Sequence, residues 1–157
     1  MSTIRRFEEI RAWQTARDLT RRIYEVSNQG TFARDYGLRD QLRRASVSIM
    51  SNIAEGFESD TQAQFIRFLG HAKASAGEVR AQLYVTLDVG YVEEDGFKTL
   101  FALAQKCSRQ LSAFIAYLKR HPDRRQIRES KVEYEVDVEK TQPSNLQTCQ
   151  PSNDPYV

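Results

Sequence analysis

Apolar residues recur every three or four positions in four separate stretches of the chain, the spacing that places them on one face of an α-helix. These stretches cover residues 10–26, 38–53, 65–87 and 97–118. In the last stretch the steps of three and four alternate over three heptads, until Pro122 stops the pattern. Glycines follow the other three stretches, where they suit helix caps or close packing. The pattern predicts an all-α, antiparallel up-down four-helix bundle.

The segment before the third stretch carries a helix-start signal. Ser59 can accept a hydrogen bond from the first turn, and Gln62, three positions later, can reach back to complete a capping box. We therefore expect the third helix to begin here and to continue for about thirty residues to Gly90.

The chain divides into a predicted bundle domain, residues 1–121, and a polar tail, residues 122–157. A chain of 157 residues with 40% apolar content supports one core. In the tail, charged residues alternate with Val132, Tyr134, Val136 and Val138, and the tetrapeptide Gln-Pro-Ser-Asn occurs twice. A lone strand beside a helical bundle has no sheet to join, so we expect the tail to be disordered.

The sequence lacks the residues that several classes of function require. No stretch approaches the ~18 consecutive apolar residues of a membrane span, and the N-terminus is polar and basic, so a cytoplasmic protein is expected. Cys107 and Cys149 are far apart, and Cys107 should be a small buried hydrophobe. There is no Cys-x-x-Cys, Glu-x-x-His or phosphate-binding glycine loop. We expect no metal, cofactor, small-molecule substrate or catalytic activity.

Charge is concentrated near the N-terminus. Residues 1–44 contain ten arginines and six acidic residues, whereas residues 45–121 contain eight of each sign. Arginine binds phosphate with two hydrogen bonds and stacks on exposed bases. The candidate nucleic-acid-binding residues are Arg17, Arg21, Arg22, Arg39, Arg43 and Arg44. Salt bridges are an equally open reading, because Asp18 and Glu25 lie within one helical turn of Arg21.

Polar residues form a second stripe on each of the two middle helices. The stripes contain Gln41, Arg44, Ser48, Asn52 and Glu55 on one helix, and His71, Ser75, Glu78 and Gln82 on the other. If they face each other or another subunit, they can form a hydrogen-bond network, with Glu78 and Arg44 as candidate partners for Asn52 and Glu55. Two solvated faces are the alternative. Tyr84, Phe101 and Tyr117 lie off the helix seams, and we expect them to be exposed, as at a subunit interface.

Several segments together resemble one known family. They are Phe7 with residues 10–16, residues 36–38 with 41–45, the run Ser-Ile-Met-Ser-Asn-Ile-Ala-Glu-Gly at 48–56, and residues 65–69, 74–79 and 87–91. They resemble the four-helix-bundle family encoded by intervening sequences of bacterial 23S ribosomal RNA genes, whose relatives include accessory proteins of diversity-generating retroelements. The resemblance covers roughly residues 4–120. One departure is Met50, where the family usually has proline, so this helix should be straighter there.

The resemblance implies a non-enzymatic bundle that forms a homo-oligomer, a ring-like pentamer in relatives, with a basic surface for RNA or DNA. Because Ser48, Asn52 and Glu55 match the most characteristic segment, it also favours a polar network or subunit contact over a solvated stripe. The alternative function is a protein-interaction scaffold or accessory subunit, for example of a reverse transcriptase, without direct contact to nucleic acid.

Overall fold

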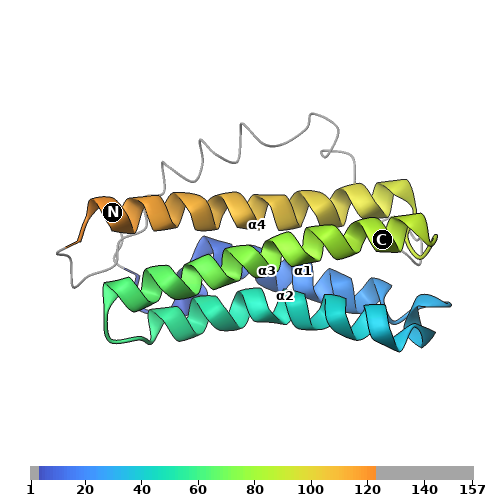
Figure 1. The fold of residues 1–157 in the computed structure, drawn as a ribbon, viewed down its shortest axis with the longest axis horizontal. Coiled ribbons are helices and arrows are strands. Elements are labelled where there is room, and N and C mark those ends of the chain that lie inside the picture. Colours follow the sequence, from blue (N-terminus) through green and yellow to red (C-terminus); the bar gives the residue numbers. More distant parts are fainter. Residues whose placement is uncertain (1–3, 123–157) are drawn as a thin grey trace.

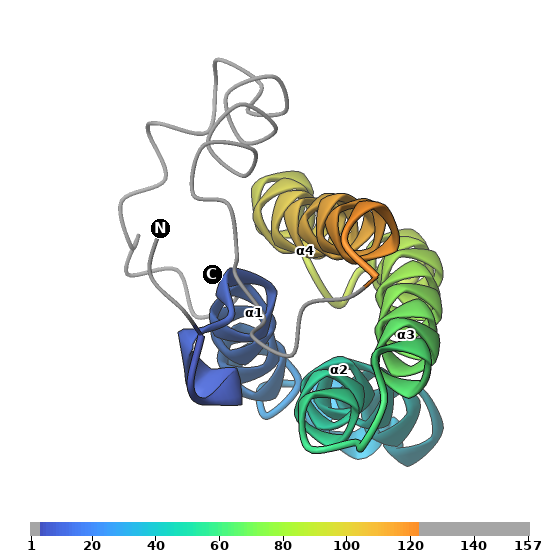
Figure 2. The same ribbon diagram turned by 90° about the vertical axis from the view of Figure 1, so that its left-hand side faces the viewer.

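The structure is a computed structural model that describes residues 4–122, and these residues form a four-helix bundle (Figures 1 and 2). The helices are α1 (Arg11–Val26), α2 (Tyr36–Phe57), α3 (Gln62–Asp88) and α4 (Glu94–Arg120), with short 3-10 helices η1 (Phe7–Glu9) and η2 (Phe32–Arg34). Successive helices run in opposite directions along the bundle (Figure 1). The sequence therefore predicted the fold class correctly. The predicted tail lies outside the described residues apart from Pro122.

The core consists of the predicted apolar seams, which meet along the bundle axis. The largest fully buried side chains come from all four helices and from η2. The α4 seam is buried from Leu100 through Leu118, whereas Phe97 at its start is only partly buried. The alternation of three and four steps thus correctly located the buried face of α4, because the inward positions of a helix recur with that period.

The three glycines that follow helical stretches have different roles. Gly30 and Gly90 adopt positive φ angles of 53° and 74°, which suits the turns after α1 and α3 because a side chain would be strained there. Gly56 instead lies inside α2 and is buried. A Cβ atom built on it would lie 2.7 Å from Cβ of Phe68 and 2.8 Å from Cδ2 of Phe65. Gly56 therefore permits the close approach of α2 to α3.

The predicted capping box at Ser59 and Gln62 is wrong by two residues. Thr61 is the N-cap of α3, and it forms the capping box with Gln64. The Ser59 hydroxyl donates instead to the carbonyl oxygen of Gly56 at the end of α2. Gln62 donates its side-chain amide to the carbonyl oxygens of Leu118 and His121, so it ties the start of α3 to the end of α4.

The three aromatic residues that were predicted to be exposed have different outcomes. Tyr117 is only 6% exposed, so the prediction that it is exposed is wrong; its ring packs 4.4 Å from that of His121 at the end of α4. Tyr84 is 51% exposed, as predicted. Phe101 is partly buried against the core, so the prediction that it is exposed is wrong; its ring contacts that of Tyr84 at 5.4 Å. Helix α2 passes through Met50 without a break.

Candidate nucleic-acid interface

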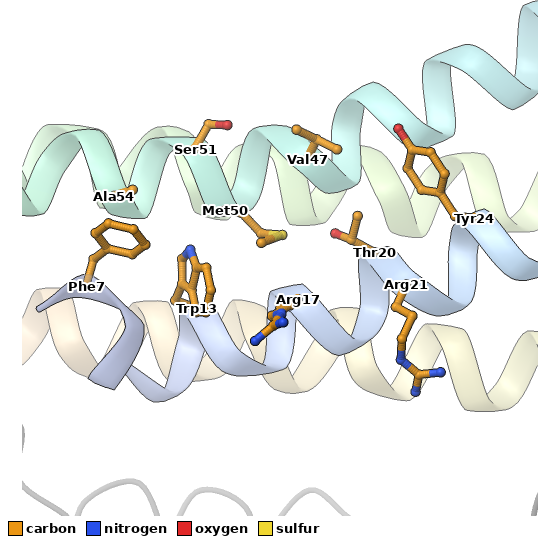
Figure 3. Close-up of a pocket in the computed structure, with 10 residues that line it drawn as sticks. All are labelled: Phe7, Trp13, Arg17, Thr20, Arg21, Tyr24, Val47, Met50, Ser51 and Ala54. Carbon is orange, nitrogen blue, oxygen red and sulfur yellow. The ribbon is translucent and has the colours of Figure 1, made fainter.

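An open groove with a volume of about 570 Å³ runs along the outer surface between α1 and α2 (Figure 3). Two stripes of helical spacing line it: Trp13, Arg17, Thr20, Arg21 and Tyr24 on α1, and Val47, Met50, Ser51 and Ala54 on α2, with Phe7 from η1 at one end. The stripes meet because α1 and α2 pack antiparallel with their larger apolar faces turned to the core. The groove is thus built from positions at the edge of each helix's buried face.

The floor of the groove is apolar and partly aromatic. The side chains of Trp13 and Met50 lie between the two helices, with the ring of Phe7 near Trp13 (Figure 3). The Phe7 and Trp13 rings meet edge to face, 5.3 Å apart. Tyr24 is 44% exposed and Val47 is 39% exposed. The protein therefore leaves part of the aromatic and aliphatic surface of this groove exposed to solvent.

Arginines surround this floor. The guanidinium carbon of Arg17 lies 5.8 Å from the centre of the Trp13 ring, and that of Arg43 lies 4.5 Å from the centre of the Tyr24 ring. Arg43 also donates through Nε to the buried Ser27 hydroxyl, 2.7 Å away. Arg44 lines the adjoining hollow with Tyr24, and among residues 4–122 it makes no ion pair. Four predicted arginines, Arg17, Arg21, Arg43 and Arg44, thus line one continuous surface.

Carboxylates engage three of the six predicted arginines, as the salt-bridge reading expected. Arg21 bonds to Asp18 at 2.8 Å and to Glu25 at 2.6 Å, and these two contacts, the Asp18 hydrogen bond first, raise the pKa of its guanidinium. Its side chain extends away from α2 (Figure 3). Arg22 bonds to the same Asp18 at 3.3 Å.

Arg39 is held at the start of α2. It bonds to Asp40 at 3.0 Å and donates to the carbonyl oxygen of Ala33 at 2.9 Å. Neither Arg22 nor Arg39 is among the residues that line the groove. Of the six predicted arginines, Arg17, Arg43 and Arg44 are therefore those that make no ion pair within residues 4–122. Asp40 nevertheless lines the same hollow as Arg43 and Arg44, and Glu25 lines the neighbouring one with Arg43.

Comparison with known proteins matches residues 8–113 of this chain to the model of one family, described as 23S rRNA-intervening sequence protein. The chain belongs to this family. A solved structure from Bacteroides thetaiotaomicron, a protein with unknown function from the S23 ribosomal protein family, has the same fold with a TM-score of 0.63. It is 19% identical, and the match covers 67% of this chain and 95% of that chain. No curated protein matches this chain.

The segment of this family member that contributes to the resemblance, residues 48–56, lies on α2 where the helix contacts α3. The Ser48 and Ser75 hydroxyls are 2.9 Å apart and link the two helices. Asn52 donates to the Ser48 carbonyl oxygen at 2.8 Å and to its hydroxyl at 3.0 Å. Three of the predicted polar residues therefore form a small network between α2 and α3.

The remaining predicted polar residues do not join this network. Asn52 has Ser48 as its partner and not Glu78, which instead accepts a hydrogen bond from Gln82 on the same helix at 3.1 Å. With Ser48 level with Ser75 in antiparallel helices, Asn52 lies level with position 71, about two turns from Glu78. Three more predicted residues, Gln41, Arg44 and Glu55, are exposed, and within residues 4–122 none of them hydrogen-bonds to the network.

The described part of this family member shows neither a metal cluster nor a membrane-spanning helix. No group of three or more His, Cys, Asp or Glu side chains in residues 4–122 has the geometry to hold a metal ion. None of the described helices is long and apolar enough to cross a membrane. His71 is exposed, and its ring lies 6.0 Å from that of Phe68.

Cys107 is expected to make the stability of the bundle sensitive to alkaline pH. Burial raises the pKa of its thiol to about 12 in the folded protein, and its Sγ donates to the carbonyl oxygen of Ala12 at 3.4 Å. The unfolded thiol ionises near its ordinary pKa of ~8.5, so the folded state loses relative stability as the pH rises from there towards 12. We expect this loss to be about 1 kcal/mol per pH unit above pH 9.

The measurement is urea unfolding at pH 8 and pH 10 of the native chain and of a Cys107→Ala variant. Other groups titrate equally in both proteins, so the difference between their pH dependences isolates Cys107. An identical pH dependence in the two proteins would show that the thiol makes no such contribution.

Proposed function

We propose that this protein is a non-enzymatic, homo-oligomeric nucleic-acid-binding protein that holds RNA in the α1–α2 groove. The observation that carries the proposal is the placement of four arginines from two helices, Arg17, Arg21, Arg43 and Arg44, around the partly exposed rings of Trp13 and Tyr24.

The groove combines the two interactions that unpaired nucleotides require. Arginines neutralise phosphates and release counterions, and aromatic rings stack on bases without regard to sequence. Arg17, Arg43 and Arg44 carry most of the usable charge, because Arg21 is already paired with Asp18 and Glu25. Unpaired bases in RNA loops can reach such ring faces, whereas bases inside a duplex cannot.

A homo-oligomer suits this groove because a single groove offers few phosphate contacts. Several copies in one assembly present several grooves to one RNA, which raises the overall affinity without any new contact. The family resemblance implies a pentamer. In addition, Tyr84, Val85 and Val89 on and just after α3 remain 45 to 53% exposed, and apolar surface of this kind is available for a neighbouring subunit.

The test is fluorescence anisotropy with a labelled RNA hairpin that has an unpaired loop, over salt concentrations from about 50 to 200 mM. A variant with Arg17→Gln and Arg44→Gln loses two phosphate contacts, so the slope of log affinity against log salt should fall by about 1.4. The matched control replaces two exposed cations on α3, Arg67→Gln and Lys73→Gln, which changes the net charge equally.

Equal slopes in the variant and its control would mean that only net charge matters, and the groove would be rejected as the binding site. A Tyr24→Ala variant adds an independent readout. Loss of one stacking partner should weaken binding by about 1 to 3 kcal/mol at all salt concentrations. If no RNA binds even at low salt, the proposal fails.

The second candidate is a protein-interaction scaffold or accessory subunit, and the apolar floor of the groove favours it. Phe7, Trp13, Val47 and Met50 form a surface of the kind on which an amphipathic helix docks. A partner that stays bound after nuclease treatment, and is lost on Trp13→Ala but not on Arg44→Gln, would support this function over RNA binding.

A further inference from the structure

The α1–α2 groove opens at the end of the bundle where the described part of the chain ends. Phe7 and Ala54 line the groove at this end, shortly before α2 ends at Phe57. Gln62, at the start of α3, donates to the carbonyl oxygen of His121. The described part of the chain therefore ends at this same end of the bundle, on the helix next to α1, since α4 packs against α1.

The sequence beyond this point contains a segment that complements the groove in polarity and charge. Residues 132–139 read Val-Glu-Tyr-Glu-Val-Asp-Val-Glu, so four apolar side chains alternate with four carboxylates. An extended chain places alternate side chains on opposite sides. One side would then match the apolar floor at Trp13, Val47 and Met50. The carboxylates would then face outward, where the long arginine side chains at the edges of the groove can reach them.

We propose that residues 132–139 of the same chain bind in the α1–α2 groove, with Val132, Tyr134, Val136 and Val138 on its apolar floor. The acidic side chains then pair with Arg17, Arg43 and Arg44, which make no ion pair within residues 4–122. When bound there, the segment competes with any polyanion for the same groove. That consequence, unlike the binding itself, rests on the proposed nucleic-acid function.

The chain is long enough for this contact. Nine residues, 123–131, separate the described end from the segment, and in extended form they reach about 30 Å. Neighbouring helices pack 8–10 Å apart, so a path from α4 across α1 to the groove spans about 20 Å. The groove from Trp13 to Tyr24 is about 16 Å long, which an extended segment of eight residues exceeds.

Trp13 reports directly on whether the groove is covered, because it is the single tryptophan of the chain and lies on the groove floor. The test measures quenching of its fluorescence by acrylamide, a neutral quencher, in the full-length protein. The variant replaces the four apolar residues of the segment with serine: Val132→Ser, Tyr134→Ser, Val136→Ser and Val138→Ser. The matched control replaces four apolar residues elsewhere in the tail: Ile127→Ser, Leu146→Ser, Tyr156→Ser and Val157→Ser.

We expect the quenching constant of Trp13 to be about twofold higher in the segment variant than in the native chain or the control. Raising the salt concentration should increase quenching in the native chain, because salt screens the pairs between arginine and carboxylate. Equal quenching in all three proteins overturns the proposal. Protection of Trp13 that disappears on dilution also overturns it, since a second copy would then cover the groove.

This experiment contains no nucleic acid, so its outcome is independent of the proposed function. Competition is measured separately, by RNA anisotropy with the same two variants. The segment variant should bind the hairpin several-fold more tightly than the control. Unchanged affinity would show that the segment does not compete with RNA.

Discussion

Replacing Phe65 with alanine is expected to lower the free energy of unfolding by about 3 to 5 kcal/mol. Phe65 is 2% exposed, and its ring meets those of Phe57 and Phe114 edge to face at 6.1 and 5.5 Å. It joins α2, α3 and α4 at the end of the bundle where the groove opens. Long packed helices cannot collapse into the space left by one ring, so a cavity adds to the lost burial.

Urea unfolding followed by circular dichroism measures this loss. The control is Tyr36→Ala, which removes an aromatic ring that is 65% exposed and lies 4.7 Å from the Arg39 guanidinium carbon. That change should cost less than about 1 kcal/mol. Similar losses from the two variants would contradict the central position assigned to Phe65.

Introducing a methyl group at Gly56 is the second change with a large expected effect. In Gly56→Ala the new Cβ would lie 2.7 Å from Cβ of Phe68, an atom that cannot move unless α3 moves. We expect a net loss of about 2 kcal/mol, because the overpacking cost of 1 to 3 kcal/mol exceeds the gain in helix propensity. Since Ala54 and Met50 lie on the same helix, the shift should also alter the groove.

Gly70→Ala on α3 is the matched control for this prediction. No atom lies within 4 Å of a Cβ built at Gly70, so the same substitution should stabilise the protein by about 0.5 to 1 kcal/mol. The two variants are compared by thermal unfolding. A gain in stability from both would mean that α2 and α3 do not approach each other as closely at Gly56 as the structure shows.

Helix positions and inward faces were readable from the sequence, whereas details at the helix ends were not. The heptad pattern located the buried face of α4, and Gly30 and Gly90 marked the turns. Ser59 and Thr61 are both residue types that commonly cap helices, so the sequence did not choose between them. The path of the chain between α2 and α3 places Thr61 in the extended conformation of an N-cap. Tyr117 lies off the seam, yet it is buried because the last turn of α4 packs its ring against His121.

The candidate site was predicted only in part. An excess of arginine in the first 44 residues pointed to α1 and α2, the helices that form the groove, and the spacing of Arg21 to Asp18 and Glu25 indicated its ion pairs. The aromatic rings of the groove were missed. Trp13 falls on the apolar periodicity of its helix, so sequence reasoning assigned it to the core. The stripe from Trp13 through Arg17 and Thr20 to Tyr24 is the sequence signal that could have revealed the side of α1 that lines the groove.

By itself, the sequence determined four amphipathic helices, the faces that pack together, the family and the basic character of the first third. These features depend on the periodicity and composition of each segment, which do not change with the segments that pack against it. The tertiary structure alone decided which arginines make no ion pair within residues 4–122 and which aromatic rings remain partly exposed to solvent. Both depend on the packing of α1 against α2, which brings Trp13 and Arg17 beside Met50, and Tyr24 beside Arg44, although these residues are far apart in the chain.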